Sequence, residues 1–229
     1  MIRNIKSKGT KMKDIYLYPN SDVLINKLGI HDAETLKEAE ANYTSYRLKE
    51  LALNGLPGRY DFRHFLKIHW FIFQDLYEWA GQQRKINIYK EEDILGGLSI
   101  DYADVFDIAK EATSILRYMS QIEWHMLALE DKSVVFAECL AKLWKVHCFR
   151  EGNTRTTITF CCQFADEHGF PINRQLFEEN SAFVRTALVA YNAVFPDLGD
   201  LSQKQHLERI VADALRHQRG GNKNDIRTE

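Results

Sequence analysis

The sequence predicts an all-α fold, a helical bundle, and three observations support it. Apolar residues recur at intervals of three and four along most of the chain, which is the spacing of one helix face. Capping residues and glycine or proline stops separate these stretches. Only one stretch alternates apolar and polar residues as a strand does. No proline- or serine-rich linker interrupts the chain, so we expect one domain over residues 15–219, between a flexible basic start at 1–14 and a flexible tail at 220–229.

Composition narrows the classes of partner and compartment. The formal net charge is −2 and the pI is about 6.5, so the chain lacks a basic field for direct nucleic-acid or membrane binding. The cysteines form no C-x-x-C pair and lie in or beside apolar helical patterns, as free buried thiols do; they are Cys139, Cys148, Cys161 and Cys162. We find no apolar signal segment or long apolar span and therefore expect a cytoplasmic protein.

The N-terminal elements follow from caps and stops. Residues 16–29 begin with an aromatic-proline turn and continue as a short helical face. Asp32 can cap a helix that runs to about Leu53 and ends at Gly55. A further helix opens at Asp61 or Phe62 and closes at residues 79–81. Its aromatic and aliphatic stripe is expected to be core; the stripe comprises Phe62, Leu66, Trp70, Phe73, Leu76 and Tyr77.

Residues 84–90 change the period to two, because isoleucines alternate with polar residues, and Gly96 and Gly97 follow as a possible turn. This predicts a strand, either in a hairpin or as a connecting edge strand. The remaining segments read as helices over residues 102–118, from Ser133 to the end of an apolar stripe at Trp144, from Thr154 to His168, and over 201–219, with one short and one longer helix in 173–195.

Residues 147–155 (HCFREGNTR) form a charged turn between two apolar helical patterns. Asn153 and Thr154 are good N-cap residues, so a helix N-terminus should face an anion here, with Gly152 allowing close approach and Arg150 and Arg155 beside it. A carboxylate in such a site, Glu151, makes sense if it faces a divalent cation on phosphate oxygens. His147 is the proton acceptor near neutral pH. The alternative is a polar helix-capping turn with no chemistry.

This run resembles the Fic family motif H-P-F-x-[D/E]-G-N-G-R-x-x-R, which it matches at His147, Phe149, Glu151, Gly152, Asn153 and Arg155. Cys148, Thr154 and Ile158 stand where the family has proline, a small residue and a second arginine. The resemblance implies the Fic fold, a bundle around the motif helix with a small β-hairpin flap. It places the flap, which would align a target segment, at Arg84, Lys85, Ile86, Asn87 and Ile88.

The resemblance also implies an activity: transfer of AMP from ATP to a Ser, Thr or Tyr hydroxyl of a target protein, with release of pyrophosphate. His147 would be the base and Glu151 would hold Mg²⁺. The phosphates would be bound by Gly152, Asn153, Thr154 and Arg155, with Arg150 beside them. Two alternatives stay open. One is a catalytically weak binding module, suggested by Ile158 and Thr154; the other is a phosphate or phosphocholine transferase.

Regulation is expected to come from outside the chain. Many Fic enzymes carry an inhibitory glutamate in the pattern [S/T]-x-x-x-E-[G/N], and we find no such pattern near either end of this sequence. An inhibitor would then be a separate antitoxin-like chain. His125, His168 and His206 have no companion at metal-ligand spacing and are expected to be structural or exposed.

Overall fold

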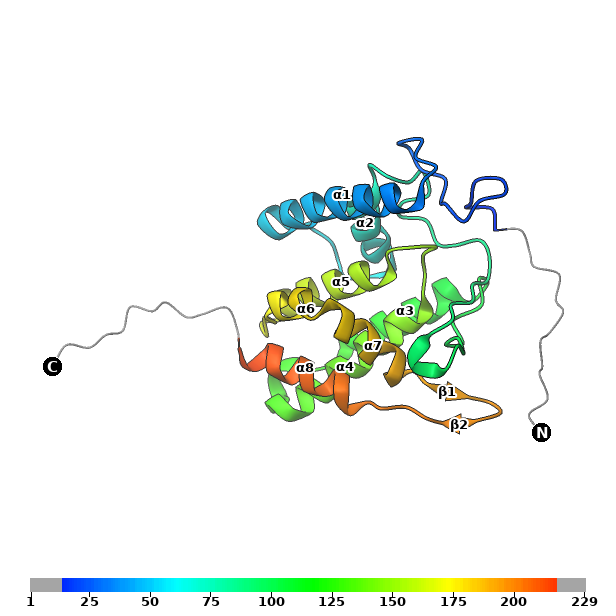
Figure 1. Cartoon of the computed structure of the whole chain (residues 1–229). Coiled ribbons are helices and arrows are strands. Elements are labelled where there is room, and N and C mark those ends of the chain that lie inside the picture. The colour runs from blue at the N-terminus through cyan, green and yellow to red at the C-terminus, as the bar shows by residue number, and fades with distance from the viewer. Residues whose placement is uncertain (1–13, 218–229) are drawn as a thin grey trace.

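A computed structural model of the chain describes residues 14–217, so the flexible start expected at 1–14, apart from Asp14, and the tail expected at 220–229 lie outside the described part. The described part is helical with one small antiparallel sheet (Figure 1). The helices are α1 (Ala33–Asn54), α2 (Phe62–Phe73), α3 (Ile108–Gln121), α4 (Leu129–Val146), α5 (Asn153–Glu167), α6 (Arg174–Glu179), α7 (Ser181–Tyr191) and α8 (Gln205–Arg216), with 3₁₀ turns η1 (Asp93–Leu95) and η2 (Trp124–Met126) and strands β1 (Val194–Phe195) and β2 (Gly199–Asp200).

Helices α4 and α5 form the centre of the bundle. α4 packs against α3, α5, α7 and α8, while α5 packs against α2, and α2 in turn against α1 (Figure 1). Large side chains with under 2% exposure fill the space between them, among them Trp144 on α4 and Phe160 and Phe164 on α5. The apolar stripes that predicted these helices therefore meet in one hydrophobic core. Among the described helices, none has the length and apolar character needed to cross a bilayer.

Helix ends agree with the sequence where a local side chain sets them. Asp32 accepts the Thr35 N–H at 2.8 Å and starts α1, and Asp61 accepts the His64 N–H at 2.9 Å and starts α2. Ser133 is not a cap, because α4 begins four residues earlier at Leu129 and the Ser133 hydroxyl donates to the Glu130 carbonyl at 2.7 Å. Acidic residues in the first turn of α4 favour the earlier start.

Two further expectations are wrong. Residues 16–29 form turns held by an isolated bridge between Leu17 and Leu24, not a helix. Helix α2 ends at Phe73, and its stripe is not all core, because Trp70 is 47% exposed. The buried Leu76 and Tyr77 follow α2 in a turn instead of extending it. The apolar stripe is thus wider than the surface that the neighbouring helices cover.

The strand expected at 84–90 is also absent from the structure. Residues 84–90 form no regular element and bend at Lys85 and Ile86, and the first bridge after them is an isolated one between Glu92 and Leu98 around η1. The paired strands lie at β1 and β2, after α7. The segment is held by the Arg84 side chain and not by strand pairing. Its guanidinium donates to the carbonyls of His147 at 2.8 Å and Ile86 at 2.8 Å and to that of Ala103. The all-α class is confirmed, and the paired strands of the described chain lie at β1 and β2 and not at residues 84–90.

Candidate functional site

The site is built on the junction of α4 and α5. Helix α4 ends at Val146 and is capped by His147, whose backbone is left-handed at φ 49 and ψ 56 and whose N–H donates to the Trp144 carbonyl. The chain then turns through residues 148–152 and enters α5 at Asn153. Because both helices are buried in the core, the turn between them has a fixed geometry.

Gly152 is required at the start of α5 for two reasons. Its φ is +80, in the left-handed region that side chains avoid, and a Cβ there would collide with the Phe73 ring. The backbone therefore lies directly against α2. Within the described part of the chain, nothing accepts a hydrogen bond from the main-chain N–H groups of Asn153, Thr154 and Arg155, which leaves them to bind an anion.

The Asn153 side chain is engaged within the turn. Its Oδ1 accepts the Phe149 N–H and its Nδ2 donates to the Phe149 carbonyl, both at 2.8 Å, and the residue is 4% exposed. The amide therefore closes the turn and is not available to phosphate, although the main-chain N–H of Asn153 is. The Thr154 hydroxyl accepts the Trp144 Nε1–H at 2.9 Å, which ties the new helix to α4.

His147 is 3% exposed and its ring lies 4.0 Å from the Tyr102 ring, centroid to centroid. Neither ring nitrogen has a hydrogen-bond partner among the described residues. Burial, followed by the charges of Lys90 and Arg84, holds the pKa of His147 well below its usual value. The imidazole is therefore neutral at pH 7 and able to accept a proton.

Glu151 is a half-buried carboxylate. Its Oε1 accepts the Gly152 N–H at 2.8 Å, and its Oε2 lies 3.5 Å from the Lys90 ammonium. Burial raises the pKa of Glu151, but the charge of Lys90, the Gly152 N–H and the charges of Arg155 and Arg150 outweigh this and lower it. The described residues contain no group of three His, Cys, Asp or Glu able to hold a metal, and Glu151 is the carboxylate of the turn at 147–155 that could take part in holding Mg²⁺.

The two arginines of the turn have different surroundings. Arg150 donates from Nε to Asp14 at 2.9 Å. Arg155 donates to the Thr44 hydroxyl at 3.0 Å and to Glu40, both on α1, and its guanidinium lies 4.9 Å from the centre of the Phe73 ring. Arg155 is thus anchored at the anion-facing end of α5, whereas Arg150 ties the turn to the start of the described chain.

The predicted flap residues separate into two groups. Arg84 is 1% exposed, and its guanidinium donates to the main-chain carbonyls of His147 and Ala103 and to Asn87 Oδ1, so it holds the segment in place. Asn87 is exposed and bonds to Asp104 at 2.6 Å. Lys85 is exposed, and Ile86 and Ile88 are half-buried. A docking edge would begin after Arg84.

Sequence reasoning missed several residues of the site. His69 on α2 is fully buried: its Nδ1 accepts the Gly81 N–H at 2.8 Å and its Nε2 donates to the Glu151 carbonyl at 3.1 Å. Burial lowers the pKa of His69 to about 3. Glu40 and Lys90 were missed as well. The alternation of Ile86, Ile88 and Lys90 could have indicated that Lys90 shares the inward face.

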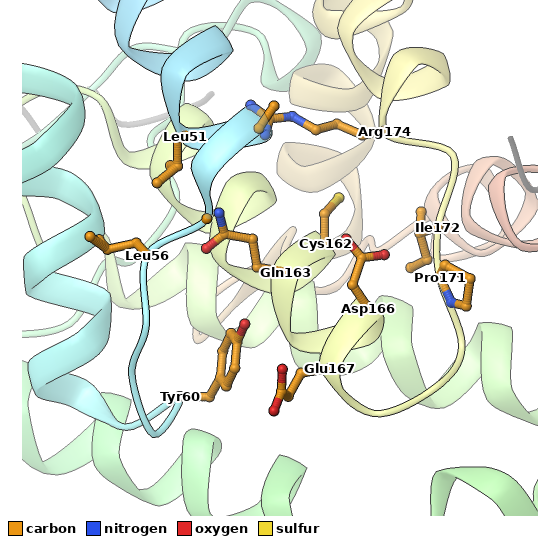
Figure 2. A pocket seen from close by; sticks show the side chains of 12 residues that line it. Leu51, Leu56, Tyr60, Cys162, Gln163, Asp166, Glu167, Pro171, Ile172 and Arg174 are labelled. Carbon is orange, nitrogen blue, oxygen red and sulfur yellow. The ribbon is translucent and has the colours of Figure 1, made fainter.

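A separate cavity of about 450 Å³ lies between the end of α1 and the second half of α5 (Figure 2). Its lining is mixed, with Leu51 and Leu56 on one side and Gln163, Asp166 and Glu167 on α5. It contains no residue of the turn at 147–155, so the candidate site does not extend into it.

The comparisons with known proteins agree with this geometry. The model of the Fic/DOC family matches residues 59–165. The chain is 32% identical over 172 residues to the probable protein adenylyltransferase y4lH of Sinorhizobium fredii, which covers 73% of this chain and 83% of that protein. The chain belongs to the Fic/DOC family. The Fic/DOC assignment agrees with the resemblance at residues 147–155.

Other Fic relatives differ in how much of their own length this chain covers. Protein adenylyltransferase VbhT of Bartonella schoenbuchensis is 31% identical over 180 residues, which are 78% of this chain and 36% of VbhT. This chain spans about a third of the length of the first curated relatives, 36% and 37%. The crystal structure of BepC from Bartonella tribocorum, with bound AMPPNP, has a TM-score of 0.71 at 22% identity and covers 87% of this chain and 95% of that one. This likeness confirms the Fic fold.

Proposed function

We propose that this chain is a protein adenylyltransferase that transfers AMP from ATP to a Ser, Thr or Tyr hydroxyl of a target protein. One observation carries the proposal: a neutral His147 with an unpartnered ring nitrogen stands in the same short turn as the open N-terminus of α5. A base and an anion site at this spacing suit attack by a hydroxyl on a phosphate. Relatives named protein adenylyltransferase support the choice of group.

In the proposed reaction the hydroxyl oxygen attacks the α-phosphorus and the bond to the bridging oxygen of the β-phosphate breaks. His147 takes the hydroxyl proton, and pyrophosphate leaves. The main-chain N–H groups of residues 153–155 bind the phosphates, and Arg155 balances their charge at the end of α5. Fixed donors of this kind stabilise charge without rearranging during the reaction.

A bound Mg²⁺ ion would neutralise phosphate charge, and Glu151 is the residue suited to hold it. It is an ionised carboxylate at the N-terminus of α5, and Mg²⁺ sites of this kind use one or two carboxylates together with phosphate oxygens. Two hydrogen bonds hold Glu151 in place. His69 donates to its main-chain carbonyl, and the Gly152 N–H donates to its carboxylate.

The partners follow from this reaction. The target would approach along the exposed segment after Arg84. The reaction would take place in the cytoplasm, where ATP is present. We also propose a separate antitoxin-like chain as the inhibitor.

One observation favours a second candidate, a nucleotide-binding module without transfer. Arg155 is already engaged by Glu40 and Thr44, and Ile158, one turn further on, packs against the core and offers no charge. Such a module would bind ATP but release it unchanged.

The test incubates the protein with a host-cell lysate and ATP labelled on either the α- or the γ-phosphate, with and without Mg²⁺. We expect label from α-ATP only, a mass gain of one AMP on a protein, and a loss of roughly a hundredfold to ten-thousandfold in His147→Ala. Label from γ-ATP would instead indicate phosphate transfer. ATP binding with no product from either label would favour the binding module.

A further inference from the structure

Lys90 lies in the middle of the candidate site, although it belongs to the segment before η1. Its ammonium is 3.5 Å from Glu151 Oε2, and the two side chains are 26% and 33% exposed. Its charge also acts on His147, where it is the largest cause after burial that lowers the pKa of the imidazole. One cation therefore contacts the proposed metal ligand, and its charge acts on the proposed base.

The segment that carries Lys90 is anchored on both sides. Glu92, two residues later, is 3% exposed and accepts two hydrogen bonds from Arg185 on α7, at 2.7 and 2.9 Å. Arg84 holds the other end to the His147 carbonyl at 2.8 Å. The Lys90 N–H donates to the Ser99 hydroxyl at 3.1 Å, which fixes the main chain at this position. The ammonium is therefore delivered to the site by a rigid support.

The charges around Lys90 are unbalanced. Glu151 is the carboxylate in direct contact with it, and that same carboxylate also accepts the Gly152 N–H. The open N–H groups of residues 153–155 add the partial positive charge of a helix N-terminus. A polyphosphate that enters the site would meet more positive than negative charge. The Lys90 ammonium could then leave the Glu151 oxygen and bind a phosphate oxygen.

We propose that Lys90 is a phosphate-binding residue. Its ammonium pairs with Glu151 in the free protein and moves to a phosphate oxygen when a nucleotide binds. Only the identity of the ligand as a nucleotide polyphosphate rests on the proposed function; transfer of AMP is not required. The exchange has a second consequence. It frees the Glu151 carboxylate at the moment when a phosphate-bound metal would need it.

The experiment measures ATP affinity in EDTA, so that neither a metal nor turnover contributes. Lys90→Gln should weaken binding about tenfold, as loss of one charged hydrogen bond does, and Lys90→Arg should restore most of it. The affinity for adenosine, which has no phosphate, should not change. Lys142→Gln is the matched control, because Lys142 pairs with Glu138 at 2.6 Å on the outer face of α4.

Glu151→Gln separates partner exchange from simple attraction. Removing the carboxylate should tighten metal-free ATP binding, and the gain should vanish in the double variant with Lys90→Gln. Unchanged ATP affinity in Lys90→Gln, equal losses for ATP and adenosine, a gain in Glu151→Gln that persists without Lys90, or no ATP binding by the wild type would overturn the proposal. ATP binding that depends on Lys90 but yields no AMP transfer would sustain it while refuting the adenylyltransferase assignment.

Discussion

Replacing His69 with phenylalanine tests whether this buried ring holds the Glu151 turn. Phenylalanine keeps a ring to stack on Phe149, whose centroid is 3.7 Å from that of His69. It removes the acceptor for the Gly81 N–H and the donor for the Glu151 carbonyl. Leaving two part-buried polar groups unpaired costs about 1–3 kcal/mol each, so the variant should lose about 2–6 kcal/mol of unfolding free energy at pH 7.5.

The pH dependence gives a second, independent magnitude. The pKa of His69 is about 3 in the folded protein against a usual 6.5, so between these values the unfolded chain binds one more proton than the folded chain. Stability therefore falls as the pH falls from 6.5 toward 3. The slope is about 1.4 kcal/mol per pH unit, or about 2 kcal/mol between pH 6.5 and pH 5. The phenylalanine variant lacks this component.

Urea unfolding of both proteins at several pH values measures these quantities. The two stability curves should converge by about 2 kcal/mol as the pH is lowered from 6.5 to 5. His125→Gln, at a histidine whose side chain is 71% exposed, should leave the wild-type slope unchanged. Parallel curves for wild type and His69→Phe would refute the neutral, buried assignment, and equal stability at pH 7.5 would refute the role of the two hydrogen bonds.

The remaining predictions concern the turn at 147–155 and its flank. Glu151→Ala should raise the Mg²⁺ concentration needed for half-maximal AMP transfer and lower turnover, because the metal loses its protein carboxylate; an unchanged Mg²⁺ titration would make Glu151 a simple ion-pair partner. Ile158→Arg should strengthen ATP binding and increase auto-modification by purified protein, since it restores a cation one turn after Arg155; labelled ATP decides this, and a weaker signal than wild type would contradict it. Gly152→Ala should cost about 2–4 kcal/mol in urea unfolding, because its φ of +80 and the Phe73 ring both oppose a Cβ; a loss below about 1 kcal/mol would show that the turn can relax.

The sequence alone determined what is local in this protein. Asp32 caps α1 and Asp61 caps α2, because each aspartate accepts an N–H only three residues away. The proposed base, the carboxylate and the open helix end could be located together because residues 147–155 are contiguous in the chain. Periodicity gave most of the other helices, since the spacing of apolar residues reports directly on a helical face.

Only the tertiary structure decided which side chains complete the site. His69 contacts the turn from 82 residues away, Glu40 reaches Arg155 across 115, and Arg84 bonds to His147 across 63. None of these spacings has a periodic or capping signature, so no pattern in the sequence could indicate them. The strand expected at 84–90 was wrong for the same reason. A strand needs a partner for its main-chain groups, and here the folded chain supplies carbonyl partners to Arg84 and an acidic one to Lys90 instead of a ladder.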